Sequence, residues 1–165
     1  MGRLTYGIAV VALLAHPVLG GQQPPDRSHP SGIARWLVRV SITGGLAGSR
    51  REVSINGDGR LQANGSGIFG NVSCTVQPGT PVVQKIEAAL EGSHLDTWQP
   101  RYVSKTNPDG CCDQFQYAVH VEQENDHGLR SARETYWFDV SAALVPPAIS
   151  ALFNSVYEAR HACVF

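Results

Sequence analysis

The stretch from Arg35 to Ile55 constrains the fold most, because it alternates apolar and polar residues on both sides of a glycine-rich break. Alternation of this kind is typical of β-strands that bury one face and expose the other. The apolar positions on the two sides of the break are Trp36, Val38, Val40, Ile42, Val53 and Ile55. The stretch therefore predicts two antiparallel strands joined as a β-hairpin, against which the other elements pack.

The break between these strands is a candidate contact loop. It comprises Gly44, Gly45, Leu46, Ala47, Gly48, Ser49, Arg50 and Arg51. The segment is too long for a two-residue turn, and its glycines allow positive φ angles or a close approach to another surface. The apolar Leu46 beside two arginines favours a contact surface, and a connector that merely joins two strands is the alternative.

The rest of the chain predicts further strands and two helices. Strands are expected at 60–63, 71–76, 113–122 and 135–140, and helices from Pro81 to Gly92 and from Pro146 onward. In the last strand, Tyr136, Phe138 and Val140 are expected to face inward. The fold class that follows is α+β: a mostly antiparallel sheet of about four to six strands with two helices packed on it, stapled by disulfides.

The N-terminus reads as a secretory signal over residues 1–20. Its apolar run, from Ile8 to Ala15, is too short to span a bilayer. A proline-rich polar leader is expected at 21–32, followed by a single domain at 33–165. These features predict a secreted or periplasmic protein with no stable membrane anchor once the signal is removed.

The charge balance bears on the class of partner. The whole chain has 13 basic and 14 acidic residues, and removal of 1–20 takes out Arg3 alone, so the formal charge moves from −1 to 12 − 14 = −2. This balance gives no electrostatic reason to expect a nucleic acid or an anionic membrane as a partner. The protein is expected to be a monomer.

Four cysteines follow the predicted signal, at Cys74, Cys111, Cys112 and Cys163. An even number of cysteines behind a signal peptide predicts two disulfides formed in an oxidising compartment. A bond between the two adjacent cysteines is strained, so Cys74 and Cys163 are each expected to pair with one member of the adjacent pair. A soft-metal site on the adjacent thiols and His161 is the alternative, although no C-x-x-C spacing supports it.

The sequence contains no motif that assigns a catalytic residue, a cofactor or a resident metal. The histidines are dispersed, and no H-E-x-x-H, G-x-S-x-G or phosphate-binding pattern occurs. A non-enzymatic binding protein is therefore the main expectation. A small hydrolase or carbohydrate-binding domain that uses exposed Trp36, Trp98 or Trp137 is an alternative.

Three short motifs resemble those of a known family. They are Gly44-Gly45-x-Ala47-Gly48-x-Arg50-Arg51 after a strand, Asp113-x-Phe115-x-Tyr117 at the start of a later strand, and Asp139-x-Ser141-x-x-Leu144-x-Pro146-x-x-x-x-x-Leu152 at the entry to the last helix. In these positions the chain resembles the emfourin family of bacterial protealysin inhibitors.

The resemblance implies a function and a contact site. Members of that family are small proteins that block thermolysin-like zinc metalloproteases, so a thermolysin-like protease is the implied partner. The loop after the first strand is implied to enter the substrate cleft, with Leu46, Ala47, Gly48 and Arg50 as contact residues. The alternative is a structural or envelope-associated binding module that inhibits no protease.

Overall fold

The computed structural model describes residues 33–67, 70–106 and 113–163. The predicted signal and leader, together with Cys111 and Cys112, lie outside these ranges. The elements in chain order are β1 (Ile33–Gly44), β2 (Ser49–Asn56), β3 (Arg60–Gly65), β4 (Asn71–Thr75), α1 (Pro81–Glu91), η2 (Leu95–Thr97), β5 (Arg101–Tyr102), β6 (Phe115–Asn125), β7 (Arg130–Phe138), η3 (Asp139–Leu144), α2 (Pro147–Ala159) and η4 (Arg160–Cys163).

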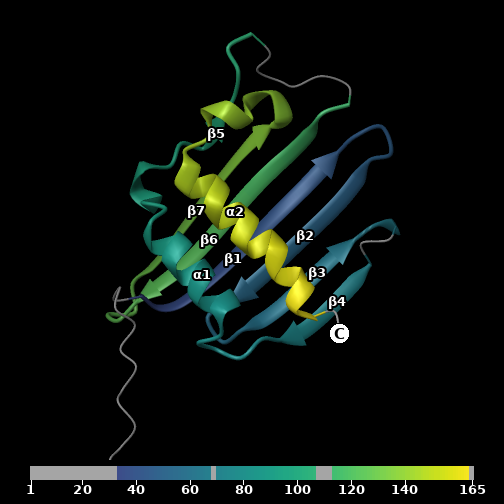
Figure 1. Cartoon of the computed structure of the whole chain (residues 1–165). Helices are drawn as coiled ribbons and strands as arrows, with labels where there is room; N and C mark the ends of the chain where they lie inside the picture. Colours follow the sequence, from purple (N-terminus) through teal and green to yellow (C-terminus); the bar gives the residue numbers. More distant parts are fainter. Residues whose placement is uncertain (1–32, 68–69, 107–112, 164–165) are drawn as a thin grey trace, which may run out of the picture.

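One sheet organises the domain, with its strands in the order β4-β3-β2-β1-β6-β7-β5 (Figure 1). Neighbouring strands are antiparallel except for the short β5, which pairs with β7 in parallel. The predicted α+β class is confirmed. The sheet has seven strands rather than four to six, because Arg101 and Tyr102 add an edge strand. They lie in the stretch 95–104, for which the sequence predicts irregular or extended structure.

The hairpin predicted at Arg35–Ile55 forms the middle of this sheet. β1 pairs along its length with β2 on one side and β6 on the other, so that Val40 lies opposite Val53 and also opposite Val119. All three side chains are fully buried. The alternating apolar residues of these strands thus form the part of the hydrophobic core that the sheet contributes.

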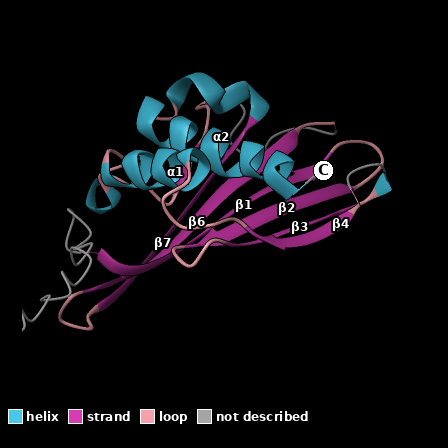
Figure 2. Cartoon of the chain, turned by 60° about the horizontal axis from the view of Figure 1, so that its bottom comes forward, coloured by secondary structure: helices cyan, strands magenta, loops and turns pink. Residues whose placement is uncertain are grey.

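Both helices pack on one face of the sheet (Figure 2). α1 buries Val83, Ile86 and Leu90, and α2 buries Ile149, Leu152, Phe153, Ser155, Val156 and Ala159. These positions recur at helical spacing, so each helix turns one stripe of its surface toward the sheet. The opposite sheet face has no helix of the described ranges over it and carries polar residues such as Arg39, His120 and Glu134.

The prediction that Tyr136, Phe138 and Val140 face inward in the last strand is wrong. Thr135 and Trp137 are buried, whereas Tyr136 and Phe138 are only half-buried and point to the other face. Val140 lies beyond the strand in η3 and is 52% exposed. Antiparallel pairing with β6 decides the face, because Trp137 lies opposite the inward Tyr117 and stacks on it with ring centroids 5.7 Å apart.

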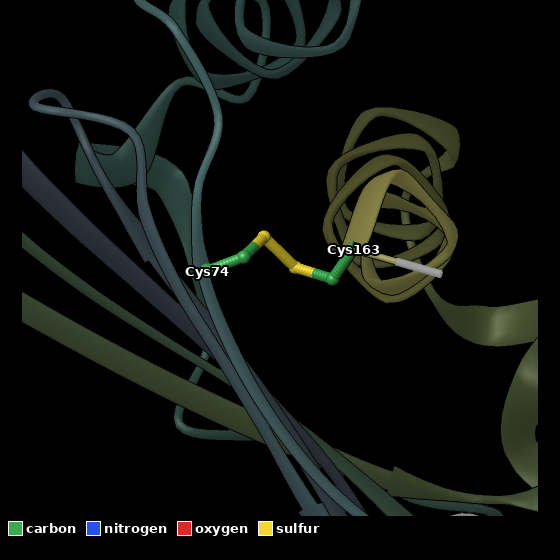
Figure 3. Close-up of a disulfide and its surroundings, with 2 residues drawn as sticks. All are labelled: Cys74 and Cys163. Carbon is green, nitrogen blue, oxygen red and sulfur yellow. A yellow bond between two sulfur atoms is a disulfide. The ribbon is translucent and has the colours of Figure 1, made fainter. Parts of the chain in front are cut away.

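The expected cysteine pairing is also wrong, since Cys74 and Cys163 are bonded to each other (Figure 3). Their Cα atoms are 5.7 Å apart although 89 positions separate them in sequence. The cause is the path of α2, which crosses the sheet diagonally and brings η4 beside the edge strand β4 (Figure 1). The disulfide therefore ties the last helical segment to one edge of the sheet.

No helix in the described ranges is long and apolar enough to cross a membrane. A disulfide of this kind is typical of a protein that folds in an oxidising, extracytoplasmic compartment.

Candidate functional site

The connection between β1 and β2 is shorter than the sequence suggested. Strand pairing continues to Gly44 opposite Ser49, so the turn itself consists of the four residues Gly45–Gly48. The backbone N–H of Gly48 donates to the carbonyl of Gly45 at 3.0 Å and closes the turn. We call this segment, Gly45–Gly48, the tip.

The two arginines that follow the tip do not form one patch. Both lie in β2, where successive side chains point to opposite faces of the sheet. Arg51 lies opposite Ile42 on the helix side, whereas Arg50 lies on the open face and is 75% exposed. Arg50 pairs with the carboxylate of Glu52 at 3.4 Å. The predicted contact set therefore separates into an apolar tip and two arginines that face different ways.

The tip is held against the start of β6. The N–H of Gly45 donates to the carbonyl of Gln114 at 3.3 Å, and the ring of Phe115 lies against Gly45. Gly44 and Gly45 have φ angles of +116° and +72°, a region that glycine occupies without strain. The glycines predicted to permit a close approach do so here, toward β6 of the same chain.

Gly44→Ala is expected to destabilise the protein by about 2 kcal/mol, since alanine is strained at this φ angle. Its Cβ would also lie 2.4 Å from the carbonyl oxygen of Gln114, so the backbone of one strand must move. Urea unfolding followed by circular dichroism measures the loss. Gly48→Ala is the matched control, because a Cβ there meets no atom within 4 Å and only the φ strain remains. Equal losses in the two variants would contradict the steric argument.

Leu46 is the outermost side chain of the tip. At 89% exposure it is the most exposed of the large hydrophobic residues described. A single exposed leucine is common on protein surfaces, but this one stands on a turn fixed by hydrogen bonds at its base. The arrangement presents an apolar side chain in a defined position.

Asp139 forms hydrogen bonds to β6, the strand against which the tip packs. The N–H of Phe115 donates to Oδ2 of Asp139 at 3.2 Å, and the hydroxyl of Tyr117 donates to the same carboxylate. Burial raises the pKa of Tyr117 to about 12, and the hydrogen bond and negative charge of Asp139 act in the same direction. The Arg51 guanidinium opposes this effect without cancelling it.

Asp139→Asn is expected to lower the pKa of Tyr117, because the carboxylate charge that disfavours tyrosinate is removed. In the wild-type protein the folded state holds the phenol proton more tightly than the unfolded chain, whose pKa is 10.0. The stability from Tyr117 is therefore full below pH 10 and is lost as the pH rises toward 12. Tyrosinate absorbance, compared with that of Tyr117→Phe, identifies the group. An unchanged titration in Asp139→Asn would exclude the contact.

The structure brings together residues from all three sequence motifs. Gly44 and Gly45, then Phe115 and Tyr117, and finally Asp139 come from separate parts of the chain and meet at the base of the tip. The sequence named these positions but assigned no role to Phe115, Tyr117 or Asp139. The alternation of Phe115 and Tyr117 in their strand was a signal in the sequence, whereas the strand order that brings them to Gly45 and Asp139 was not.

Comparison with protein-family models and with curated proteins found no match to this chain.

The structure gives little support to the two other kinds of site considered, a metal site and a site built on exposed tryptophan rings. In the described ranges, no three histidine, cysteine or carboxylate side chains are grouped so that they could hold a metal ion. The proposed thiol and His161 site cannot be placed, since Cys111 and Cys112 lie outside those ranges. Trp36, Trp98 and Trp137 are all buried, so the alternative that relied on exposed tryptophan rings is wrong.

Proposed function

We propose that this chain is an emfourin-like, non-catalytic inhibitor of a thermolysin-like metalloprotease, and that the tip enters the substrate cleft of the enzyme. The observation that carries the proposal is Leu46, a large apolar side chain exposed at the end of a turn that the protein itself holds in place. An exposed apolar anchor of this kind fills a pocket of a partner and excludes water there.

The fixed shape of the tip supports inhibition over loose peptide binding. A flexible loop loses conformational freedom when it binds, and that loss reduces affinity. Here the closed turn, the hydrogen bond from Gly45 to Gln114 and the packing of Phe115 restrict the tip before any partner arrives. A substrate-like segment held in one conformation binds more tightly than the same segment in a disordered chain.

The disulfide and the N-terminal sequence bear on the compartment in which the protein acts. A disulfide between Cys74 and Cys163, together with the signal-like N-terminus, supports a secreted or periplasmic location. The proposed partner is a protease that is present in the same compartment. We expect one inhibitor molecule to bind one enzyme molecule, since the proposed contact is a single protruding turn.

The proposal is tested by titrating thermolysin-like proteases, including those of the same organism, with the purified oxidised protein. Stoichiometric inhibition with a Kd of about 1 nM, typical of rigid protease inhibitors, is expected for the true target. Absence of inhibition across the panel, by a protein shown to be folded, would overturn the proposal. It would favour the alternative of an envelope-associated binding module without inhibitory activity.

A further inference from the structure

The surface of η3 and of the first turn of α2 is exposed and apolar. No charged residue occurs between Asp139 and Glu158. Val140 and Leu144 are 52% and 54% exposed, and they are two of the four large hydrophobic residues that are exposed in the described ranges. A contiguous exposed apolar surface is typical of an interaction site. The exposed residues, which we call the η3 surface, are Val140, Ala142, Ala143, Leu144, Pro146 and Pro147.

The contacts of three other residues hold η3 in place. The carboxylate of Asp139 accepts a hydrogen bond from the N–H of Phe115 at 3.2 Å, and the hydroxyl of Ser141 accepts one from the N–H of Ser104 at 2.8 Å. Val145, at the end of η3, is buried in the core. The η3 surface is therefore presented in a fixed position, as the tip is, and it loses little conformational freedom when a partner binds.

The η3 surface and the tip lie at the same end of the sheet (Figure 1). Phe115 connects them, because its ring lies against Gly45 and its N–H donates to Asp139, the first residue of η3. β7, which leads into η3, is two strands away from β1 in the sheet, so the separation across the strands is roughly 10 Å at about 4.8 Å per strand. One partner can therefore contact both regions.

The tip by itself is too small for the affinity proposed above. Stable protein–protein interfaces bury about 800 Å² on each partner, from roughly 20–30 residues. The tip has four residues, Gly45–Gly48. The remaining contact must come from surface beside the tip, where the open face of the sheet carries the charged Arg50 and Glu52 and η3 carries apolar residues. The apolar side suits the centre of an interface, because burying it leaves no polar group unpaired.

We propose that the η3 surface is a second contact region for the protease whose cleft the tip enters, and that it packs against an uncharged, apolar part of the enzyme beside that cleft. The inference rests on the proposed function. The chemistry of the partner surface follows from the absence of charge on the η3 surface, since a charged group of the enzyme would be desolvated there without a counter-charge. Both regions contact one enzyme molecule, so the stoichiometry stays one to one.

The variants Leu144→Asp and Ala143→Arg test the inference, because each places a charge in the η3 surface. Inhibition constants are measured with the protease that the wild-type protein inhibits, and each variant is expected to weaken inhibition by about tenfold. Ala143 is exposed, so Ala143→Arg removes no packing and tests the contact even if Leu144→Asp alters η3. Leu129→Asp, at the other end of the sheet, is the matched control and is expected to leave inhibition unchanged. Thermal unfolding verifies that each variant is folded.

The possible outcomes separate this inference from the proposed function. A wild-type protein that inhibits no thermolysin-like protease would overturn both. Inhibition that is weakened in Leu46→Asp but unchanged in Leu144→Asp and Ala143→Arg would overturn this inference and leave the proposed function standing. Sedimentation of the free protein tests a second copy of the chain as the occupant. A wild-type dimer that Leu144→Asp converts to monomers would show that the η3 surface binds another copy, and it would overturn the inference.

Discussion

The double variant Cys74→Ser/Cys163→Ser is expected to lose about 4 kcal/mol of unfolding free energy, because the bond closes a loop with a sequence separation of 89. In the chain-entropy account, a disulfide lowers the conformational entropy of the unfolded chain, and the effect grows with the length of the loop that it closes. Removing the bond restores this entropy and so stabilises the unfolded state. Urea unfolding of the oxidised wild type and of the double variant gives the difference. Both cysteines are replaced so that neither is left as a free thiol that could pair with Cys111 or Cys112.

The adjacent cysteines supply the control for this prediction. In Cys111→Ser/Cys112→Ser the bond between Cys74 and Cys163 is expected to persist, and a non-reduced peptide digest detects it by mass. The pairing expected from the sequence would instead leave Cys74 and Cys163 without their partners in that variant. A digest that lacks the joined Cys74 and Cys163 peptides would contradict the disulfide described here.

Leu46→Asp is expected to weaken protease inhibition by about 100-fold or more, because it replaces the apolar anchor of the tip with a charge that must be desolvated in the cleft. This prediction rests on the proposed function. The melting temperature is expected to stay within about 1 °C of the wild type, since Leu46 is 89% exposed and buries little area in the free protein. Inhibition constants and thermal unfolding are measured on the same preparations.

Leu129→Asp is the matched control for Leu46→Asp. Leu129 is also an exposed leucine in a hairpin turn, at 69% exposure, but its turn joins β6 and β7 at the other end of the sheet. It is expected to leave inhibition unchanged. Equal loss of inhibition in the two variants would indicate a general effect of added charge and would remove the tip from the interface.

The predicted elements that were confirmed depend on local patterns. Alternation fixed the hairpin from Arg35 to Ile55, and helical spacing after Pro81 and Pro146 predicted α1 and α2 near their observed bounds. A residue's immediate neighbours along the chain decide these features. The same local reasoning failed at 136–138, where three aromatic residues in a row leave no alternation from which to assign a face.

The candidate site was only partly visible in the sequence. The glycines and Leu46 marked the tip, but its length of four residues follows from the pairing of Gly44 with Ser49. The support from Phe115 and Asp139 requires that β6 lie next to β1 and that η3 begin beside β6.

The sequence by itself determined the two α-helices, the strands other than β5, and the residue that is exposed at the tip, because side-chain periodicity and turn chemistry act over a few residues. Only the tertiary structure decided that Cys74 bonds to Cys163, that Trp137 and not Tyr136 faces the core, and that three distant motifs meet. These outcomes depend on strand order and on the path of α2. Contacts between segments far apart in sequence set both, and no local pattern encodes them.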